Sequence, residues 1–181
     1  RFEFSSDLHA ENMLWGATLR SPHPYARIIN IDLSAAYKIT GVEAIITADD
    51  VPGKKTYGLI SSDQPVFAQD FVRYVGEPIA AVAADHPETC RRALAAIKVE
   101  YEVLTPLTDA ELAIQPTTSP IHPDGNIIRR QQIITGDQNL HGEIVVEGTY
   151  EIGMQDQAFL GLEAALALPD SGGKGIEMFV A

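Results

Sequence analysis

The fold is decided by residues 79–103, which have the sequence IAAVAADHPETCRRALAAIKVEYEV. The run from Ile79 to Ala84 is small, apolar and unbroken, typical of a strand buried on both faces, although its period alone is also compatible with a helix. The next residues decide between the two, because Asp85 can accept a hydrogen bond at a helix start while Glu88, three residues on, reaches back. We therefore expect a buried strand that leads directly into a capped helix.

The helix is predicted to run from about His86 to Ile97. Its buried face is predicted from four apolar residues at the i, i+3, i+4, i+7 spacing, which are Cys90, Ala93, Leu94 and Ile97. Residues 99–103 then alternate between apolar and polar as a strand does, and Pro106 ends the pattern. The order strand, helix, strand predicts an α+β protein with a mixed sheet and few helices on one side of it.

Further elements are expected on both sides of this stretch. Strand character occurs in residues 13–20, 27–33, 42–47, 144–150, 164–168 and 176–180. Helical turns are expected at residues 34–39, where Ser34 is the predicted cap, and at residues 109–114. The Pro, Gly and Asp content of residues 48–62 predicts a loop, and the three prolines of residues 115–125 predict an extended connector.

The composition indicates a globular, acidic protein. Hydrophobic residues make up 45% of the 181 residues and charged residues 21%, so disorder is disfavoured. The net charge of -12 would repel a phosphate backbone or an anionic lipid surface, and no apolar run approaches the roughly 20 residues of a membrane span. Nucleic acid and membrane partners are therefore not expected. The single cysteine, Cys90, cannot form an internal disulfide, which favours a cytoplasmic location.

The two ends of the chain predict a piece of a longer protein. Arg1 takes the place of an initiating methionine, no signal pattern follows it, and residues 176–180 predict a strand at the other end. The strands expected after residue 143 would then lack native partners. We expect their exposed edges either to recruit a second copy, giving a homo-oligomer, or to be poorly ordered.

Residue chemistry alone offers few candidates for a site. The five histidines are isolated and predict loop or cap positions rather than a metal site: His9, His23, His86, His122 and His141. Residues 172–175, Gly-Gly-Lys-Gly, lack the first glycine and the Ser or Thr of a phosphate-binding loop, which favours a hairpin turn. Cys90 is expected to be buried on the helix and inert as a nucleophile.

Two polar segments are open to a structural or a functional interpretation. Glu77, between Gly76 and Pro78, is either a catalytic carboxylate or, as we favour, part of a bend into the next strand. Residues 155–157, Gln-Asp-Gln, either bind a polar ligand through their side chains or, as we favour, form a capped or edge-strand turn.

Several blocks of the sequence occur in the order of a known family. They are TLRSPHPYARI at 18–28, TADDVPG at 47–53, VRYVGEPIAAV at 72–82, VEGTY at 146–150 and LEAALA at 162–167. In these blocks the chain resembles the molybdenum-binding subunit of xanthine dehydrogenases and aldehyde oxidases, beginning with its α/β-hammerhead domain. The segment GMQDQAFLG at 153–161 is similar to a bacterial xanthine dehydrogenase branch, with Gln157 where the family usually has His.

The resemblance implies how the chain is divided. It implies a hammerhead domain at residues 1–106, an extended linker at 107–142 and the truncated beginning of a molybdopterin-binding domain at 143–181. The Gly-Gly-Gly-Phe-Gly loop and the late catalytic glutamate of the family have no counterpart here. No catalytic, cofactor-binding or metal-ligating residue is therefore assigned, and this fragment is expected to be structural and inactive, without a cofactor of its own.

For the complete subunit, the resemblance implies oxidative hydroxylation of a purine such as xanthine or hypoxanthine. Water is the oxygen source and molybdopterin-bound molybdenum the cofactor. The implied partners are the remainder of the subunit and the iron-sulfur and FAD subunits or domains. Relatives that act on aldehydes, carbon monoxide or a pyridine carboxylate are an alternative. A non-catalytic module that binds a ligand or another protein is an alternative of a different class.

Overall fold

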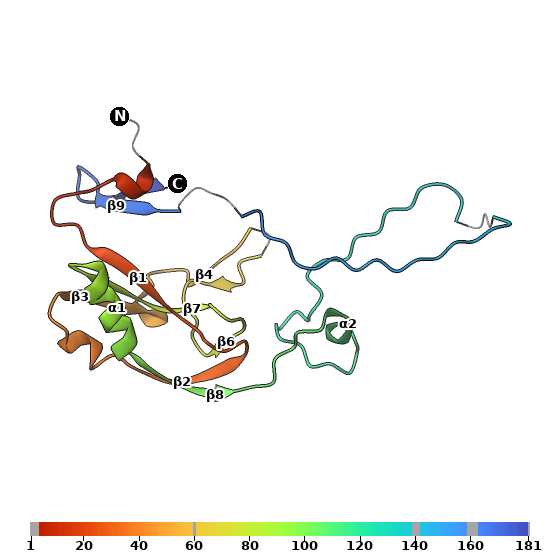
Figure 1. Cartoon of the computed structure of the whole chain (residues 1–181), viewed down its shortest axis with the longest axis horizontal. Helices are drawn as coiled ribbons and strands as arrows, with labels where there is room; N and C mark the ends of the chain where they lie inside the picture. Colours follow the sequence, from red (N-terminus) through yellow and green to blue (C-terminus); the bar gives the residue numbers. More distant parts are fainter. Residues whose placement is uncertain (1–3, 60, 139–141, 159–162, 181) are drawn as a thin grey trace. The chain divides into compact units, whose positions relative to one another are not determined.

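The computed structural model describes residues 4–59, 61–138, 142–158 and 163–180 of the chain (Figure 1). It divides into two units, one formed by Asn12–Ile128 and the other by Arg1–Glu11 together with Arg129–Ala181. Both clusters of buried hydrophobic residues belong to the first, larger unit. The core of the fold therefore lies between residues 12 and 128.

A three-stranded antiparallel sheet forms one layer of the larger unit. Its middle strand is β7 (Pro78–Ala84), between β1 (Trp15–Arg20) and β3 (Val42–Thr47). Val82 lies opposite Ile45 in the register of the sheet, and both side chains are buried. A strand that is paired along both edges and carries small apolar side chains confirms the buried strand predicted at residues 79–84.

The helix α1 (Pro87–Ala96) follows β7 directly, as predicted, but its cap is a different residue. His86 is the N-cap, and its Nδ1 accepts a hydrogen bond from the backbone N–H of Glu88 at 3.1 Å. The cap predicted at Asp85 is therefore wrong by one position. Pro87 explains the shift, because proline has no N–H to be satisfied and is favoured as the first helical residue, which leaves the residue before it as the cap.

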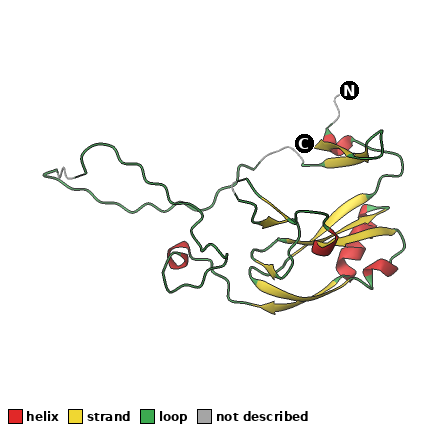
Figure 2. Cartoon of the chain, turned by 180° about the vertical axis from the view of Figure 1, so that it is seen from behind, coloured by secondary structure: helices red, strands yellow, loops and turns green. Residues whose placement is uncertain are grey.

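α1 covers the first sheet with the face that the sequence predicts. It contacts β1, β7 and β3 (Figure 2). Cys90, Ala93 and Ile97 are buried, and Leu94 is half-buried against the same cluster. Arg92 is exposed, as a residue on the opposite face should be. Within the described segments, no helix has the length and apolar character that crossing a membrane requires.

A second antiparallel sheet places β2 (Ala26–Asp32) between β6 (Phe71–Val72) and β8 (Lys98–Val103). α1 therefore connects strands of two different sheets. The α+β fold with few helices is confirmed, and the strand pairs of the described residues are all antiparallel, a simpler pairing than the mixed sheet we expected. Three side chains pack against both core clusters and so join the layers: Leu19, Ile31 and Val99.

Short elements complete the larger unit. They are η2 (Ala36–Lys38), η3 (Ala48–Asp50), β4 (Thr56–Tyr57), β5 (Gln64–Pro65) and α2 (Ala110–Ala113). The turn predicted after Ser34 is present, but Ser34 is not its cap, since its backbone N–H donates to Asp32 and the N-cap Ala35 has no side-chain bond. The loop predicted at residues 48–62 contains η3 and β4. Residues 115–125 form no helix or strand, as expected.

The smaller unit contains η1 (Ser5–Asp7) and the antiparallel hairpin of β9 (Ala165–Pro169) and β10 (Ile176–Val180). These strands confirm the last two that the sequence predicts, and β9 contacts η1. The strand predicted at residues 144–150 is wrong. Those residues are exposed and have no strand partner in the described part of the chain, and β-branched composition does not form a strand without a ladder to join.

Candidate functional site

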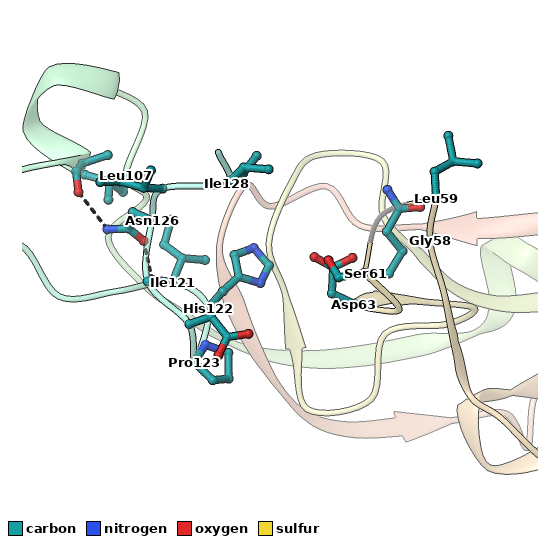
Figure 3. A pocket seen from close by; sticks show the side chains of 15 residues that line it. Gly58, Leu59, Ser61, Asp63, Leu107, Ile121, His122, Pro123, Asn126 and Ile128 are labelled. Carbon is teal, nitrogen blue, oxygen red and sulfur yellow. Dashed lines mark hydrogen bonds between the residues drawn. The ribbon is translucent and has the colours of Figure 1, made fainter. Parts of the chain in front are cut away.

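A cavity of about 650 Å³ lies in the larger unit between two loops that are distant in the sequence (Figure 3). One wall comes from the turn between β4 and β5, and the other from residues 121–128, which follow α2. Leu107 and Ala113 also line it. Sequence reasoning missed this cavity, because neither loop carries a motif and only the fold brings the two together.

The first wall is shaped by the tight turn between β4 and β5. Ser62 donates its hydroxyl to the carbonyl of Thr56 at 2.9 Å, which closes the turn. Gly58 is required within it, because a Cβ there would overlap the carbonyl oxygen of Ser61. The turn leaves the side chain of Leu59 fully exposed.

The second wall is held by one asparagine. The amide nitrogen of Asn126 donates to the carbonyl of Ala113 at 3.0 Å, and its amide oxygen accepts from the backbone N–H of Ile121 at 2.8 Å (Figure 3). α2 is itself capped by the Asp109 carboxylate, which accepts from two backbone N–H groups of the helix. These bonds give the loop a defined shape although it has no regular secondary structure.

The lining of the cavity includes two acidic side chains. His122 and Asp63 point into it from opposite walls (Figure 3), and Asp124 adds a second carboxylate. Among the described residues, neither lysine nor arginine lines the cavity. This lining favours a neutral or cationic group and disfavours a phosphate. In the described ranges, no group of three or more His, Cys, Asp or Glu side chains is placed to hold a metal ion.

Glu77 lies in a bend that its own contacts stabilise. Its side chain is 2% exposed, and its carboxylate accepts the backbone N–H of Arg73. Its carbonyl accepts from the N–H of Ser21 at 2.9 Å, and Arg20 donates to the carbonyl of Gly76 at 2.8 Å. The carboxylate therefore faces the interior and fixes the loop that enters β7, the structural role that we favoured for it.

Cys90 is buried, as predicted. Its Sγ donates to the carbonyl of Trp15 at 3.1 Å, and burial raises the pKa of the thiol above its ordinary value. A raised pKa keeps the sulfur protonated at neutral pH, and the protonated form is a poor nucleophile. The contacts of Cys90 therefore indicate packing rather than catalysis.

The described histidines are dispersed over the structure. His86 caps α1, His23 makes an edge contact with Tyr101 at a centroid distance of 4.8 Å, and His9 bonds the carbonyl of Asp7. His122 is the one that lines the cavity. His141 lies outside the described residues.

The glycine-rich segment forms a turn of the kind predicted. It connects β9 and β10, with the N–H of Asp170 donating to the carbonyl of Gly175 at 3.0 Å. Residues 155–157 are exposed and form neither a strand nor a turn, so the capped or edge-strand turn predicted there is wrong.

Comparison with known proteins identifies the family. Residues 1–105 match the family described as aldehyde oxidase and xanthine dehydrogenase, a/b hammerhead domain. The chain belongs to this family. Its relatives are oxidoreductases, and the resemblance seen in the sequence blocks is confirmed.

Individual relatives of the hammerhead family match most of the chain. A probable xanthine dehydrogenase subunit of Bacillus subtilis (strain 168) is 38% identical over 180 residues, which cover 98% of this chain and 24% of the relative. The nicotinate dehydrogenase large molybdopterin subunit of Eubacterium barkeri is 36% identical over 94% of this chain and 41% of its own length. This chain thus spans about a quarter of the first relative and about two fifths of the second.

A solved structure of the family has the same fold. The aldehyde oxidoreductase of Desulfovibrio gigas matches 67% of this chain and 15% of its own, with a TM-score of 0.63 and 28% sequence identity. The hammerhead fold expected from the sequence is therefore confirmed by sequence and by structure.

Proposed function

We propose that this chain is the hammerhead part of the molybdenum-binding subunit of a hydroxylase that oxidises a purine such as xanthine. The observation that carries the proposal is its similarity, over 98% of the chain, to a probable xanthine dehydrogenase subunit. In the complete enzyme, oxygen from water enters a ring C–H bond, and the electrons leave through iron-sulfur clusters and FAD on partner subunits or domains. We place this enzyme in the cytoplasm.

The proposal divides the chain as the sequence resemblance implies. Residues 1–106 are the hammerhead domain, residues 107–142 a linker, and residues 143–181 the beginning of a molybdopterin-binding domain. The two three-stranded sheets of the hammerhead share apolar neighbours, and the buried carboxylate of Glu77 fixes the loop that enters β7. Such a body is suited to hold neighbouring parts of the subunit in place.

The described lining of the cavity does not fit a molybdopterin cofactor. A pterin phosphate needs cations or several N–H donors, whereas the described residues that line the cavity include Asp63 and Asp124 and neither lysine nor arginine. We therefore assign no step of the reaction to residues of this chain. Its role in our proposal is to scaffold the part of the subunit that binds the cofactor.

A pyridine carboxylate is the second candidate substrate. It is favoured by the 36% identity to the nicotinate dehydrogenase subunit, which is close to the identity with the xanthine dehydrogenase subunit. Xanthine and nicotinate are both nitrogen heterocycles that are hydroxylated at a ring carbon, so one scaffold serves either reaction.

The test is an activity assay of the complete enzyme. The product of the complete gene, expressed with its partner subunits and supplied with molybdenum, is assayed with xanthine, hypoxanthine, nicotinate and an aldehyde under one set of conditions. We expect the highest kcat/KM with xanthine or hypoxanthine. Higher kcat/KM with nicotinate would transfer the proposal to the second candidate, and no hydroxylation of any of them would contradict both.

A further inference from the structure

The cavity between the two loops has the size and the apolar lining of a small-molecule site. Its volume of about 650 Å³ lies within the range of about 300 to 1,000 Å³ that is usual for ligand pockets in proteins. Four apolar side chains of the lining surround it: Leu107, Ala113, Ile121 and Ile127. Leu107 and Ile121 are half-buried, so each keeps part of its apolar surface free to contact a ligand.

Two carboxylates of the lining have no counter-charge in the described part of the chain. The three ion pairs found there use other acidic residues, which are Asp49, Glu88 and Glu102. Among the described residues, the carboxylates of Asp63 and Asp124 have neither an ion-pair partner nor a hydrogen bond. Two uncompensated negative charges at one cavity attract a cation and repel an anion.

Hydrogen bonds of the two loops set the backbone positions of these acidic residues. The N–H of Gly125 donates to the carbonyl of His122 at 3.0 Å, which closes the turn that contains Asp124. On the other wall, Asp63 directly follows the hydrogen-bonded turn between β4 and β5. Because both loops are shaped before a ligand arrives, less conformational freedom is lost on binding.

The lining also distinguishes between classes of cation. In the described ranges, no three His, Cys, Asp or Glu side chains are grouped to hold a metal ion, and the cavity is much larger than an ion. An ammonium group has three N–H donors, which suits acceptors that point inward from opposite walls, as Asp63 and His122 do (Figure 3). The apolar side chains suit a hydrocarbon chain or ring attached to that ammonium. These features favour an organic amine over a metal ion.

We propose that this cavity binds a small organic amine, with its ammonium group between Asp63 and Asp124 and its apolar part against Leu107 and Ile121. The inference goes beyond the proposed function, which gives this chain a scaffolding role and assigns no ligand to it. Xanthine and nicotinate carry no ammonium group, so the ligand of this cavity differs from both candidate substrates.

Isothermal titration calorimetry with three probes of similar shape tests the proposal. The probes are the cation 2-phenylethylammonium, the neutral 2-phenylethanol and the anion 3-phenylpropanoate. Each is titrated at low ionic strength into the product of the complete gene and into the 181-residue chain. Asp63→Asn, Asp124→Asn and the double variant remove the two charges at nearly constant size. Glu43→Gln is the matched control, because Glu43 is an exposed residue of β3 that does not line the cavity.

We expect the ammonium probe to bind about 10-fold more tightly than the alcohol, and the anionic probe to bind more weakly than both. Each single variant should weaken binding of the ammonium probe about 3-fold and the double variant about 10-fold, with binding of the alcohol unchanged. Glu43→Gln should bind all three probes as the parent does. Because Asp63 and Asp124 are exposed, we expect the variants to fold, which circular dichroism checks. If one single variant does not fold, the other variant and the comparison of the probes still decide the result.

Three results would overturn the proposal. They are equal binding of the three probes by the parent, equal binding of the ammonium probe by the parent and the double variant, and no detectable binding of the ammonium probe. Binding to the 181-residue chain that is lost in the complete product would overturn it in favour of a cavity filled by further polypeptide. The titration is independent of the hydroxylase assay, so failure of the proposed function would leave its result unchanged.

Discussion

Gly41 shows how a single residue connects the elements of the hammerhead. It precedes β3 with φ +94, its carbonyl accepts the N–H of Asp85 at 2.9 Å, and a Cβ at this position would overlap the carboxylate of Asp85. We expect Gly41→Ala to lower the free energy of unfolding by about 1 to 2 kcal/mol from the left-handed backbone alone. Urea denaturation of the two proteins measures the difference.

Gly16→Ala is the matched control for this substitution. Gly16 is exposed in β1, and no atom lies within 4 Å of the Cβ that it would gain. This variant is expected to be as stable as the parent or slightly more stable. Equal stabilities of Gly41→Ala and Gly16→Ala would contradict the conformation described for Gly41.

Cys90 gives a prediction that depends on pH. Burial raises the pKa of its thiol, so the neutral form contributes stability below the ordinary thiol pKa, and this contribution is lost as the pH rises through the raised value. We expect slow labelling by a disulfide reagent from pH 7 to about pH 9 in the folded protein, and rapid labelling in urea. Rapid labelling of the native chain at neutral pH would show that Cys90 is accessible and ionised.

At the scale of elements, the side chains through which α1 packs on its sheet are buried to different degrees. Leu94 is half-buried, whereas a fully buried leucine loses about 2 to 5 kcal/mol on replacement by alanine. We therefore expect Leu94→Ala to lower the free energy of unfolding by about 1 to 2 kcal/mol. This loss is smaller than the one expected if Leu94 were fully buried, as the sequence pattern predicts. Arg92→Ala on the exposed face should change stability by less than about 0.5 kcal/mol, and a larger effect there than at Leu94 would mean that the face is misassigned.

Local signals explain which elements could be predicted from the sequence. The stretch from β7 to β8 contains a short apolar run, a helical period and a strand alternation. Each of its elements can therefore be predicted from residues that are close in the sequence. β4, β5 and β6 have two residues each, and their existence depends on partners elsewhere in the fold. Residues 144–150 show the opposite case, where strand propensity is high and the partner is missing from the described residues.

The cavity could not be predicted for a related reason. Its walls are separated by more than fifty residues of sequence, and the bonds of Asn126 to Ala113 and Ile121 shape one wall without any motif. Residue chemistry alone considers isolated side chains, so it cannot identify a site that only the fold assembles. The family was accessible from sequence because its blocks are spread along the whole chain.

At the scale of the whole molecule, we assign no cofactor-binding residue to this chain and therefore expect it to have no activity of its own. We expect the purified 181-residue chain to bind no molybdenum stoichiometrically and to turn over no xanthine, since the described lining of its cavity has no lysine or arginine to bind a phosphate. Metal analysis after dialysis and a xanthine turnover assay measure both properties. Turnover by the isolated chain would show that it contains catalytic groups that we have not assigned.

Residues 129–138, which directly follow the larger unit, determine where a protease first cuts the chain. Residues 129–138 are exposed and form no helix or strand, whereas residues 115–125 are held by the Asn126 bonds. A protease should therefore cut residues 129–138 before it cuts residues 115–125. We expect trypsin to cut first at Arg129 or Arg130 and to leave residues 12–128 intact, as mass spectrometry of a time course would reveal. The double variant Arg129→Gln and Arg130→Gln should delay this cut without changing thermal unfolding, because neither side chain is buried. A first cut within α1 or β7 would contradict the assignment of the stable unit to residues 12–128. An equal rate of the first cut in the parent and the double variant would show that Arg129 and Arg130 are not the first sites.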